Sequence, residues 1–164
     1  MCIYATADEP KRTKSDIVCY KVLERFYPKE GSGDRMLGKR FKSIYYDFKF
    51  GLGYLYKAIG FRMKLGPYNP FRPDNDMPRT LYPTYGGFYS YKTLDAAKES
   101  FTNCKHWFGN TRFVIVRCVI PKGTMYYKSL KIKKQKDTIY CSEEIKVTAY
   151  MNRGVWIEYK KPEE

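Results

Sequence analysis

Histidine and cysteine are the residues of this chain whose chemistry is most readily turned to catalysis or metal binding. The chain has a single histidine, His106, which excludes a metal site built on two histidines. Cys104 lies two positions before it on a predicted helix, and side chains at that spacing do not face each other. No complete Gly-x-x-x-x-Gly-Lys-Ser/Thr phosphate loop is present either. The pattern indicates a surface or interfacial histidine, and we expect no metal site and no cofactor. It favours a protein that is not an enzyme and leaves enzymatic activity open.

Basic and aromatic residues are interleaved over residues 39–92, and this combination is typical of nucleic-acid binding. Such binders pair a cationic groove that follows phosphates with flat rings on which bases stack. The candidate nucleic-acid-binding residues are Arg40, Lys42, Tyr45, Tyr46, Lys49, Tyr54, Lys57, Arg62, Lys64, Lys128, Lys131, Lys133, Lys134 and Lys136. Burial of a large apolar side chain also stabilises a fold by about 2–3 kcal/mol. We therefore expect over half of the rings in this region to be packed inside.

Two pairs of motifs resemble those of a known enzyme family. Ile120-Pro-Lys-Gly-Thr124 and the later Tyr140-Cys-Ser-Glu-Glu-Ile145 resemble the late part of an ADP-ribosyltransferase-like domain. Val18-Cys-Tyr-Lys21 and Gly87-Phe-Tyr-Ser90 stand, in the same chain order, for the first two motifs of that family. The resemblance implies a protein, active or degenerate, that binds NAD or another nucleotide.

The same resemblance implies a set of site residues, which are Lys21, Ser90, Glu143 and Glu144. Lys21 would hold the pyrophosphate, in place of the family's usual arginine or histidine. Glu143 or Glu144 would orient a ribose hydroxyl or activate the attacking group. The alternative interpretation is that both glutamates are solvated residues at the start of a strand.

Three longer stretches resemble small proteins of bacteriophages and gut bacteria. They are DIVCYKVL at residues 16–23, GFYSYKTLDAAK at residues 87–98 and VIPKGTMYY at residues 119–127. This resemblance implies an origin in a mobile element and brings no known activity.

The charge of the chain points to a negatively charged partner. Lys and Arg number 31 against 17 Asp and Glu, a formal net charge of +14. A surplus of this size attracts nucleic acid, an anionic membrane or an acidic protein, although some lineages simply favour lysine-rich surfaces. No run of about 20 apolar residues is present, so we expect no membrane contact. The start of the chain has no apolar run of signal-peptide length. We expect a location in the cytoplasm. If the protein is phage-encoded, this is the cytoplasm of the host cell, or the protein is part of the virion.

The elements that would position these residues follow from hydrophobic periodicity. Strands are predicted at about 17–23, 87–91, 112–120, 144–150 and 154–160, with a tight turn at Asn152-Arg-Gly154. Thr93 is the predicted cap of a helix over residues 94–108, whose apolar stripe includes Phe101 and Cys104. The fold class predicted is α+β, a mostly antiparallel sheet packed by one main helix. Cys19 and Cys118 are predicted to be free thiols in the core.

The chain is predicted to form a single domain over residues 1–164. Residues 1–16 are a polar lead, 28–40 a loop, 41–91 an aromatic-rich, proline-containing insertion and 128–136 an exposed loop or edge. Three functions are compatible with these features. The first is a basic accessory protein that binds nucleic acid or a nucleic-acid-handling complex. The others are the transferase-like protein and an inhibitor or virion protein that binds an acidic protein surface.

Overall fold

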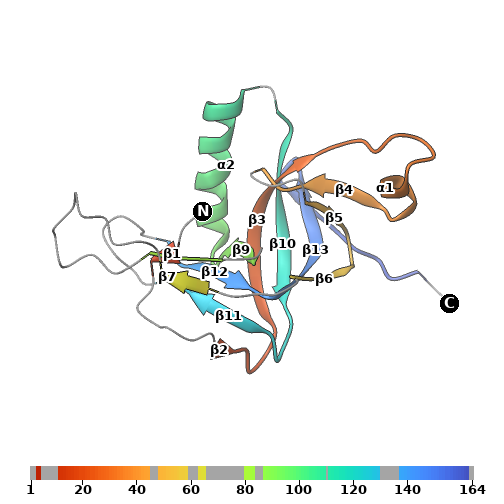
Figure 1. The fold of residues 1–164 in the computed structure, drawn as a ribbon. Coiled ribbons are helices and arrows are strands. Elements are labelled where there is room, and N and C mark those ends of the chain that lie inside the picture. The colour runs from red at the N-terminus through yellow and green to blue at the C-terminus, as the bar shows by residue number, and fades with distance from the viewer. Residues whose placement is uncertain are drawn as a thin grey trace.

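The computed structural model describes residues 3–4, 11–44, 48–58, 63–65, 80–83, 87–109, 111–129 and 137–162 (Figure 1). These residues form two β-sheets and two helices, and every strand ladder among them is antiparallel. The prediction of a mostly antiparallel sheet is confirmed. The structure is richer in strands than the predicted α+β class with one main helix, because segments expected to be loops also pair into the sheets.

The larger sheet has eleven strands, with β3 (Ile17–Arg25) and β10 (Phe113–Ile120) near its centre. Its order is β14-β13-β10-β3-β9-β12-β11-β2, with β4 attached to β3 and β5, and β6 attached to β13. The remaining strands of this sheet are β2 (Lys11–Arg12), β4 (Lys39–Lys42), β5 (Lys49–Gly51), β6 (Leu55–Lys57), β9 (Phe88–Tyr91), β11 (Met125–Lys128), β12 (Ile139–Ser142), β13 (Glu144–Asn152) and β14 (Val155–Glu158). The five predicted strands are all present, and four of them, β3, β10, β13 and β14, are neighbours in the expected sheet.

The smaller sheet has three strands in the order β1-β8-β7. They are β1 (Ile3–Tyr4), β7 (Met63–Leu65) and β8 (Thr80–Pro83). The polar lead (residues 1–16) and the insertion (residues 41–91) thus supply the strands of this sheet, and the sequence pattern predicts none of the three. Backbone pairing with a distant partner supplies the order that the local sequence does not predict.

Helix α2 (Leu94–Phe108) forms where the periodicity predicts it and packs against β3, β9 and β10. The Thr93 hydroxyl accepts a hydrogen bond from the Ala96 amide, and Gly109 ends the helix at a positive φ of 61°. Cys104 is buried as expected. Phe101 is only partly buried, and His106 is exposed, in agreement with a surface histidine. No helix among the described residues is long and apolar enough to cross a membrane.

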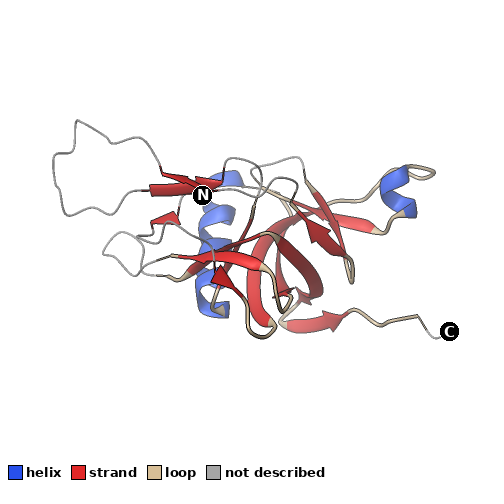
Figure 2. Ribbon diagram, turned by 60° about the horizontal axis from the view of Figure 1, so that its bottom comes forward, coloured by secondary structure: helices blue, strands red, loops and turns tan. Residues whose placement is uncertain are grey.

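A second helix, the single turn α1 (Gly33–Met36), lies inside the segment expected to be a loop. Figures 1 and 2 place α1 and α2 on opposite sides of the main sheet. The Ser32 side chain accepts a hydrogen bond from the Arg35 amide, which is a helix N-cap contact. This cap satisfies one of the backbone amides at the start of the turn.

The main sheet buries side chains on both of its faces. The face away from α2 holds the larger cluster, which includes Cys19 and Leu23 of β3, and the helix face holds Val22. Cys19, Cys104, Cys118 and Cys141 are all buried free thiols. The core prediction for Cys19 and Cys118 is therefore confirmed.

The turn between β13 and β14 has the predicted hairpin geometry. Asn152 pairs with Val155, which leaves a loop of the two residues Arg153 and Gly154. Both have a positive φ, 50° and 78°, as the tightest hairpin turns require. This turn places Arg153 at the end of the sheet where β10 begins.

Candidate nucleic-acid interface

Three lysines of the predicted cationic track are held in ion pairs. Lys42 Nζ lies 3.6 Å from a carboxylate oxygen of Glu24, and Lys57 Nζ lies 3.9 Å from one of Glu143. Lys49 Nζ lies 2.7 Å from a carboxylate oxygen of Asp34. These pairs reduce the net positive charge that the β4–β6 region presents.

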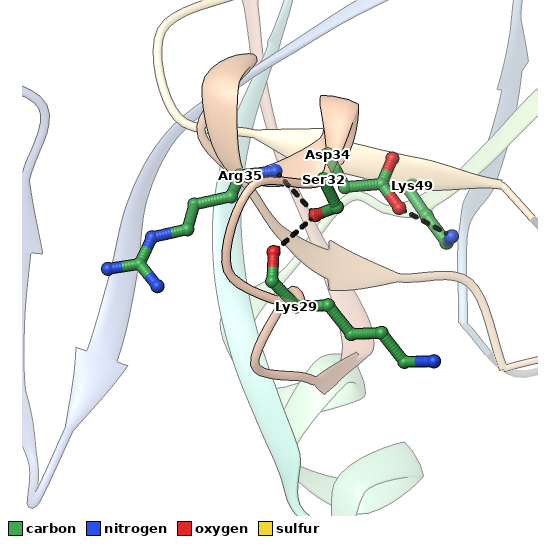
Figure 3. A network of polar contacts seen from close by, with 5 residues as sticks. All are labelled: Lys29, Ser32, Asp34, Arg35 and Lys49. Carbon is green, nitrogen blue, oxygen red and sulfur yellow. Dashed lines mark hydrogen bonds and ion pairs between the residues drawn. The ribbon is translucent and has the colours of Figure 1, made fainter.

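The contacts around α1 show why Lys49 serves the fold (Figure 3). The Ser32 hydroxyl, which caps the helix, also donates a hydrogen bond of 2.6 Å to the Lys29 carbonyl. Asp34, in the first turn of the helix, accepts a hydrogen bond from Lys49. Lys49 Nζ also lies 5.5 Å from the centre of the Phe26 ring. Arg35 extends away from this network in Figure 3. We therefore assign Lys49 to the stabilisation of α1 against β5.

The other predicted residues divide into exposed ones and ones that the structure does not describe. Arg40 and Lys128 are exposed, and Tyr54 is 51% exposed with its ring beside Gly38 and Gly51. Of Lys64, only the backbone in β7 is described. The predictions for Tyr45, Tyr46, Arg62, Lys131, Lys133, Lys134 and Lys136 lie outside the described residues.

The structure brings together two of the four residues that the transferase resemblance implies. Tyr20 of β3 pairs with Tyr91 of β9, so Lys21 and Ser90 occupy neighbouring positions across the two strands. The Lys21 ammonium group donates a hydrogen bond to the backbone carbonyl of Tyr89. Ser90 is 1% exposed. Lys21 alternates with Cys19 and Leu23 of the larger core cluster, so its side chain points to the face of the sheet that lies away from α2.

The two glutamates that the resemblance implies, Glu143 and Glu144, contact other residues than Lys21 and Ser90. Glu143 pairs with Lys57, and Glu144 accepts a hydrogen bond of 3.2 Å from the Thr124 hydroxyl. Ile145, the residue after Glu144, belongs to the core cluster on the Cys19 face, so alternation directs Glu144 to the other face of β13. Among the described residues, neither glutamate contacts Lys21 or Ser90.

The environment of Lys21 predicts a dependence of stability on pH. Burial lowers the pKa of Lys21 below its ordinary value, and the nearby thiols of Cys118, Cys19 and Cys141 only partly oppose this. The unfolded chain then binds more protons than the folded chain between the lowered pKa and the ordinary value of about 10.4. The Lys21 contribution therefore makes the protein more stable as the pH rises through that window.

We expect this effect as a difference between the wild type and Lys21→Met. The free energy of unfolding of the variant minus that of the wild type should be largest below the lowered pKa and should fall as the pH approaches about 10. Urea denaturation at several pH values measures it. Lys122→Met, at an exposed position, removes one positive charge and serves as the control. A difference for Lys21→Met that is constant with pH would contradict the prediction.

A basic groove lies at the end of the sheet where β3 ends and β10 begins, beside the last turns of α2. Figure 1 shows this end of the two strands at the top. It has a volume of about 560 Å³. Its charged and polar lining includes Arg25, Lys105, Arg112, Asn152 and Arg153, and no described lining residue is acidic. None of the four cations forms an ion pair with a carboxylate of the described residues. The basic groove is therefore an uncompensated concentration of positive charge.

An exposed aromatic ring stands between two of these cations. Tyr27 is 69% exposed. The guanidinium carbon of Arg25 lies 5.8 Å from its ring centre, and that of Arg112 lies 5.6 Å away. Arg112 Nη1 also donates a hydrogen bond of 3.1 Å to the Tyr27 hydroxyl. The two arginines hold this exposed ring in a defined position.

Strand pairing explains how this set is assembled. Phe113 pairs with Glu24, and the Arg25 amide donates a hydrogen bond of 2.8 Å to the Arg112 carbonyl. The two arginines are 87 positions apart in the chain but occupy adjacent strand ends. The hairpin turn adds Arg153, and the last turn of α2 adds Lys105.

Sequence reasoning missed the basic groove because it searched for dense runs of basic residues. A usable signal was present: Arg112 begins a predicted strand, Arg153 lies in the predicted hairpin turn, and Arg25 follows the predicted strand 17–23 by two positions. Antiparallel pairing of those strands gathers such residues at one edge of the sheet.

A second cavity, of about 490 Å³, lies along another face of α2. It is lined by Glu99 and Asp137 together with Trp107, which is 78% exposed. The two carboxylates would repel phosphate, so this cavity does not extend the basic groove as an anion site.

In comparisons with known proteins, the chain matches no protein-family model, no curated protein and no solved structure.

Proposed function

We propose that this protein binds nucleic acid, without enzymatic activity of its own, through the basic groove. The observation that carries the proposal is a concave surface with four cations, no acidic residue among its described lining and an exposed tyrosine. Guanidinium groups remain charged at all relevant pH values and bind phosphate oxygens through paired hydrogen bonds. The resemblance of three stretches to bacteriophage and gut-bacterial proteins supports a role as an accessory protein of a mobile element, in the cytoplasm of its host.

The combination of four cations with an exposed aromatic ring favours nucleic acid over an acidic protein as the partner. A polynucleotide presents a phosphate for every base, so one strand can satisfy several cations and the aromatic ring together. An acidic protein surface would also attract the four cations, but it supplies no regular series of bases for Tyr27. The binding experiment with oligonucleotides also distinguishes these two kinds of partner.

The test compares two variants that lose the same amount of positive charge. The groove variant carries Arg112→Gln and Arg153→Asn, with asparagine chosen because it tolerates the positive φ of position 153. The control carries Arg35→Gln and Arg40→Gln, two exposed arginines away from the basic groove. The affinity of each protein for a single-stranded oligonucleotide is measured by fluorescence anisotropy over a range of salt concentrations.

Each phosphate neutralised contributes about −0.7 to the slope of log K against log salt on single strands. If Arg112 and Arg153 each contact one phosphate, the groove variant should flatten the slope by about 1.4 units while the control stays close to the wild type. Equal flattening in both variants would show diffuse attraction to the whole surface. If the wild type binds neither single-stranded nor duplex oligonucleotides at about 50 mM salt, the basic surface serves an acidic protein instead.

A further inference from the structure

We infer that the basic groove selects single-stranded nucleic acid by stacking one unpaired base on Tyr27. This inference rests on the proposed function and adds the form of nucleic acid that the site accepts. Tyr27 is the aromatic side chain that carries the argument, because its ring is largely exposed at the groove and is flanked by two cations.

The ring is oriented before any ligand arrives. Arg112 contacts both the Tyr27 ring and its hydroxyl group. Arg25 lies between two rings, since its guanidinium carbon is 5.8 Å from the centre of Tyr27 and 5.4 Å from that of Tyr150. Tyr150 belongs to β13 and packs against the buried Phe41, with ring centres 5.5 Å apart. Arg25 is thus a positioning residue that ties the exposed ring to the core, which limits the entropy lost when a base stacks on it.

The guanidinium groups that hold the ring also stand where the phosphates of a stacked strand would pass. Neither arginine is neutralised by a described carboxylate, so both retain their charge for a ligand. Binding sites for flexible strands combine these two elements, a cationic path and a stacking ring. Because every base has a π-face, stacking of this kind tolerates any sequence.

The shape of the basic groove disfavours duplex. Its volume of about 560 Å³ lies in the range of small-ligand pockets, which suits one or two nucleotides. Its walls come from α2 on one side and the β13–β14 turn on the other. Bases in a duplex are stacked inside the double helix, and moving one out costs a few kcal/mol. A free strand offers its bases at no such cost.

The experiment pairs a protein change with a matched change in the ligand. Wild type, Tyr27→Leu and Tyr27→Phe are each titrated with a single-stranded oligothymidylate and with the same oligonucleotide carrying abasic sites at its centre. Tyr54→Leu is the control, because Tyr54 is also exposed, at 51%, but does not line the basic groove. Thermal unfolding of each variant verifies that it is folded.

Tyr27→Leu should weaken binding of the oligothymidylate by about 5-fold to 150-fold and leave the salt slope unchanged. On the abasic oligonucleotide the same change should have little effect, because the stacking partner is absent. Tyr27→Phe keeps the ring and should bind oligothymidylate within a few fold of the wild type. Tyr54→Leu should bind both ligands as the wild type does.

Two failures can be told apart. If Tyr27→Leu weakens binding of both oligonucleotides equally, or of neither, while the Arg112 and Arg153 variant still flattens the salt slope, the stacking inference is overturned and the proposed function stands. If the arginine variant also leaves the slope unchanged, the basic groove is not the nucleic-acid site and both proposals fail.

Discussion

Phe50→Ala is expected to lower the free energy of unfolding by about 3–5 kcal/mol. Phe50 is 1% exposed, and its ring centre lies 4.8 Å from that of Phe48, 5.2 Å from Tyr56 and 6.0 Å from Phe88. Alanine would leave a cavity between β5, β6 and β9, which the surrounding strands cannot close without losing their hydrogen bonds. Urea denaturation of the two proteins measures the change.

Phe48→Ala provides a control within the same ring cluster. Phe48 contacts the rings of Phe50, Tyr56 and Phe88 but is 38% exposed, so water can fill the space that its side chain leaves. We expect this variant to lose about 1–2 kcal/mol, because a smaller apolar area returns to water. Equal losses for the two variants would show that the aromatic segment around β5 is not part of the main core.

Gly53→Ala should destabilise the protein by about 2–5 kcal/mol, through two separate causes. Gly53 has a φ of 81°, and an L-residue in that region costs about 1–2 kcal/mol. The added Cβ would also lie 2.5 Å from the Tyr159 ring, and such overpacking costs about 1–3 kcal/mol. Because the Gly53 amide donates a hydrogen bond of 2.8 Å to the Val147 carbonyl, the backbone is not free to move away.

Gly123→Ala separates the two causes. Gly123 has a φ of 82° and nothing within 4 Å of an added Cβ, so this variant should lose only the backbone contribution of about 1–2 kcal/mol. Combining Gly53→Ala with Tyr159→Ala should remove the additional loss, since the ring that the new methyl group meets is gone. If Gly53→Ala and Gly123→Ala have the same effect, the Tyr159 ring moves aside freely and the overpacking argument is wrong.

Local patterns in the sequence predict the elements whose stability depends on near neighbours. The apolar run of β10 and the alternation of Ile145, Val147 and Ala149 in β13 place these strands correctly, because a period of two directs such side chains to one face. Thr93 predicts the start of α2 because its cap contact involves a residue three positions later. The fold is sheet-rich beyond this prediction because strands such as β4, β11 and β12 are too short for their own sequences to signal them.

The candidate site depends on contacts between residues far apart in the chain. The sequence correctly indicates a strongly basic chain, but it cannot show that Lys42 meets Glu24 or that Lys57 meets Glu143. Equally, no local pattern brings Arg25 to Arg112; only the antiparallel register of β3 and β10 does so. Charge is a property of each residue and is additive along the chain, whereas the field at a surface depends on distances that are set by folding. For this reason composition predicts an anionic partner, and strand pairing determines which cations remain available to bind it.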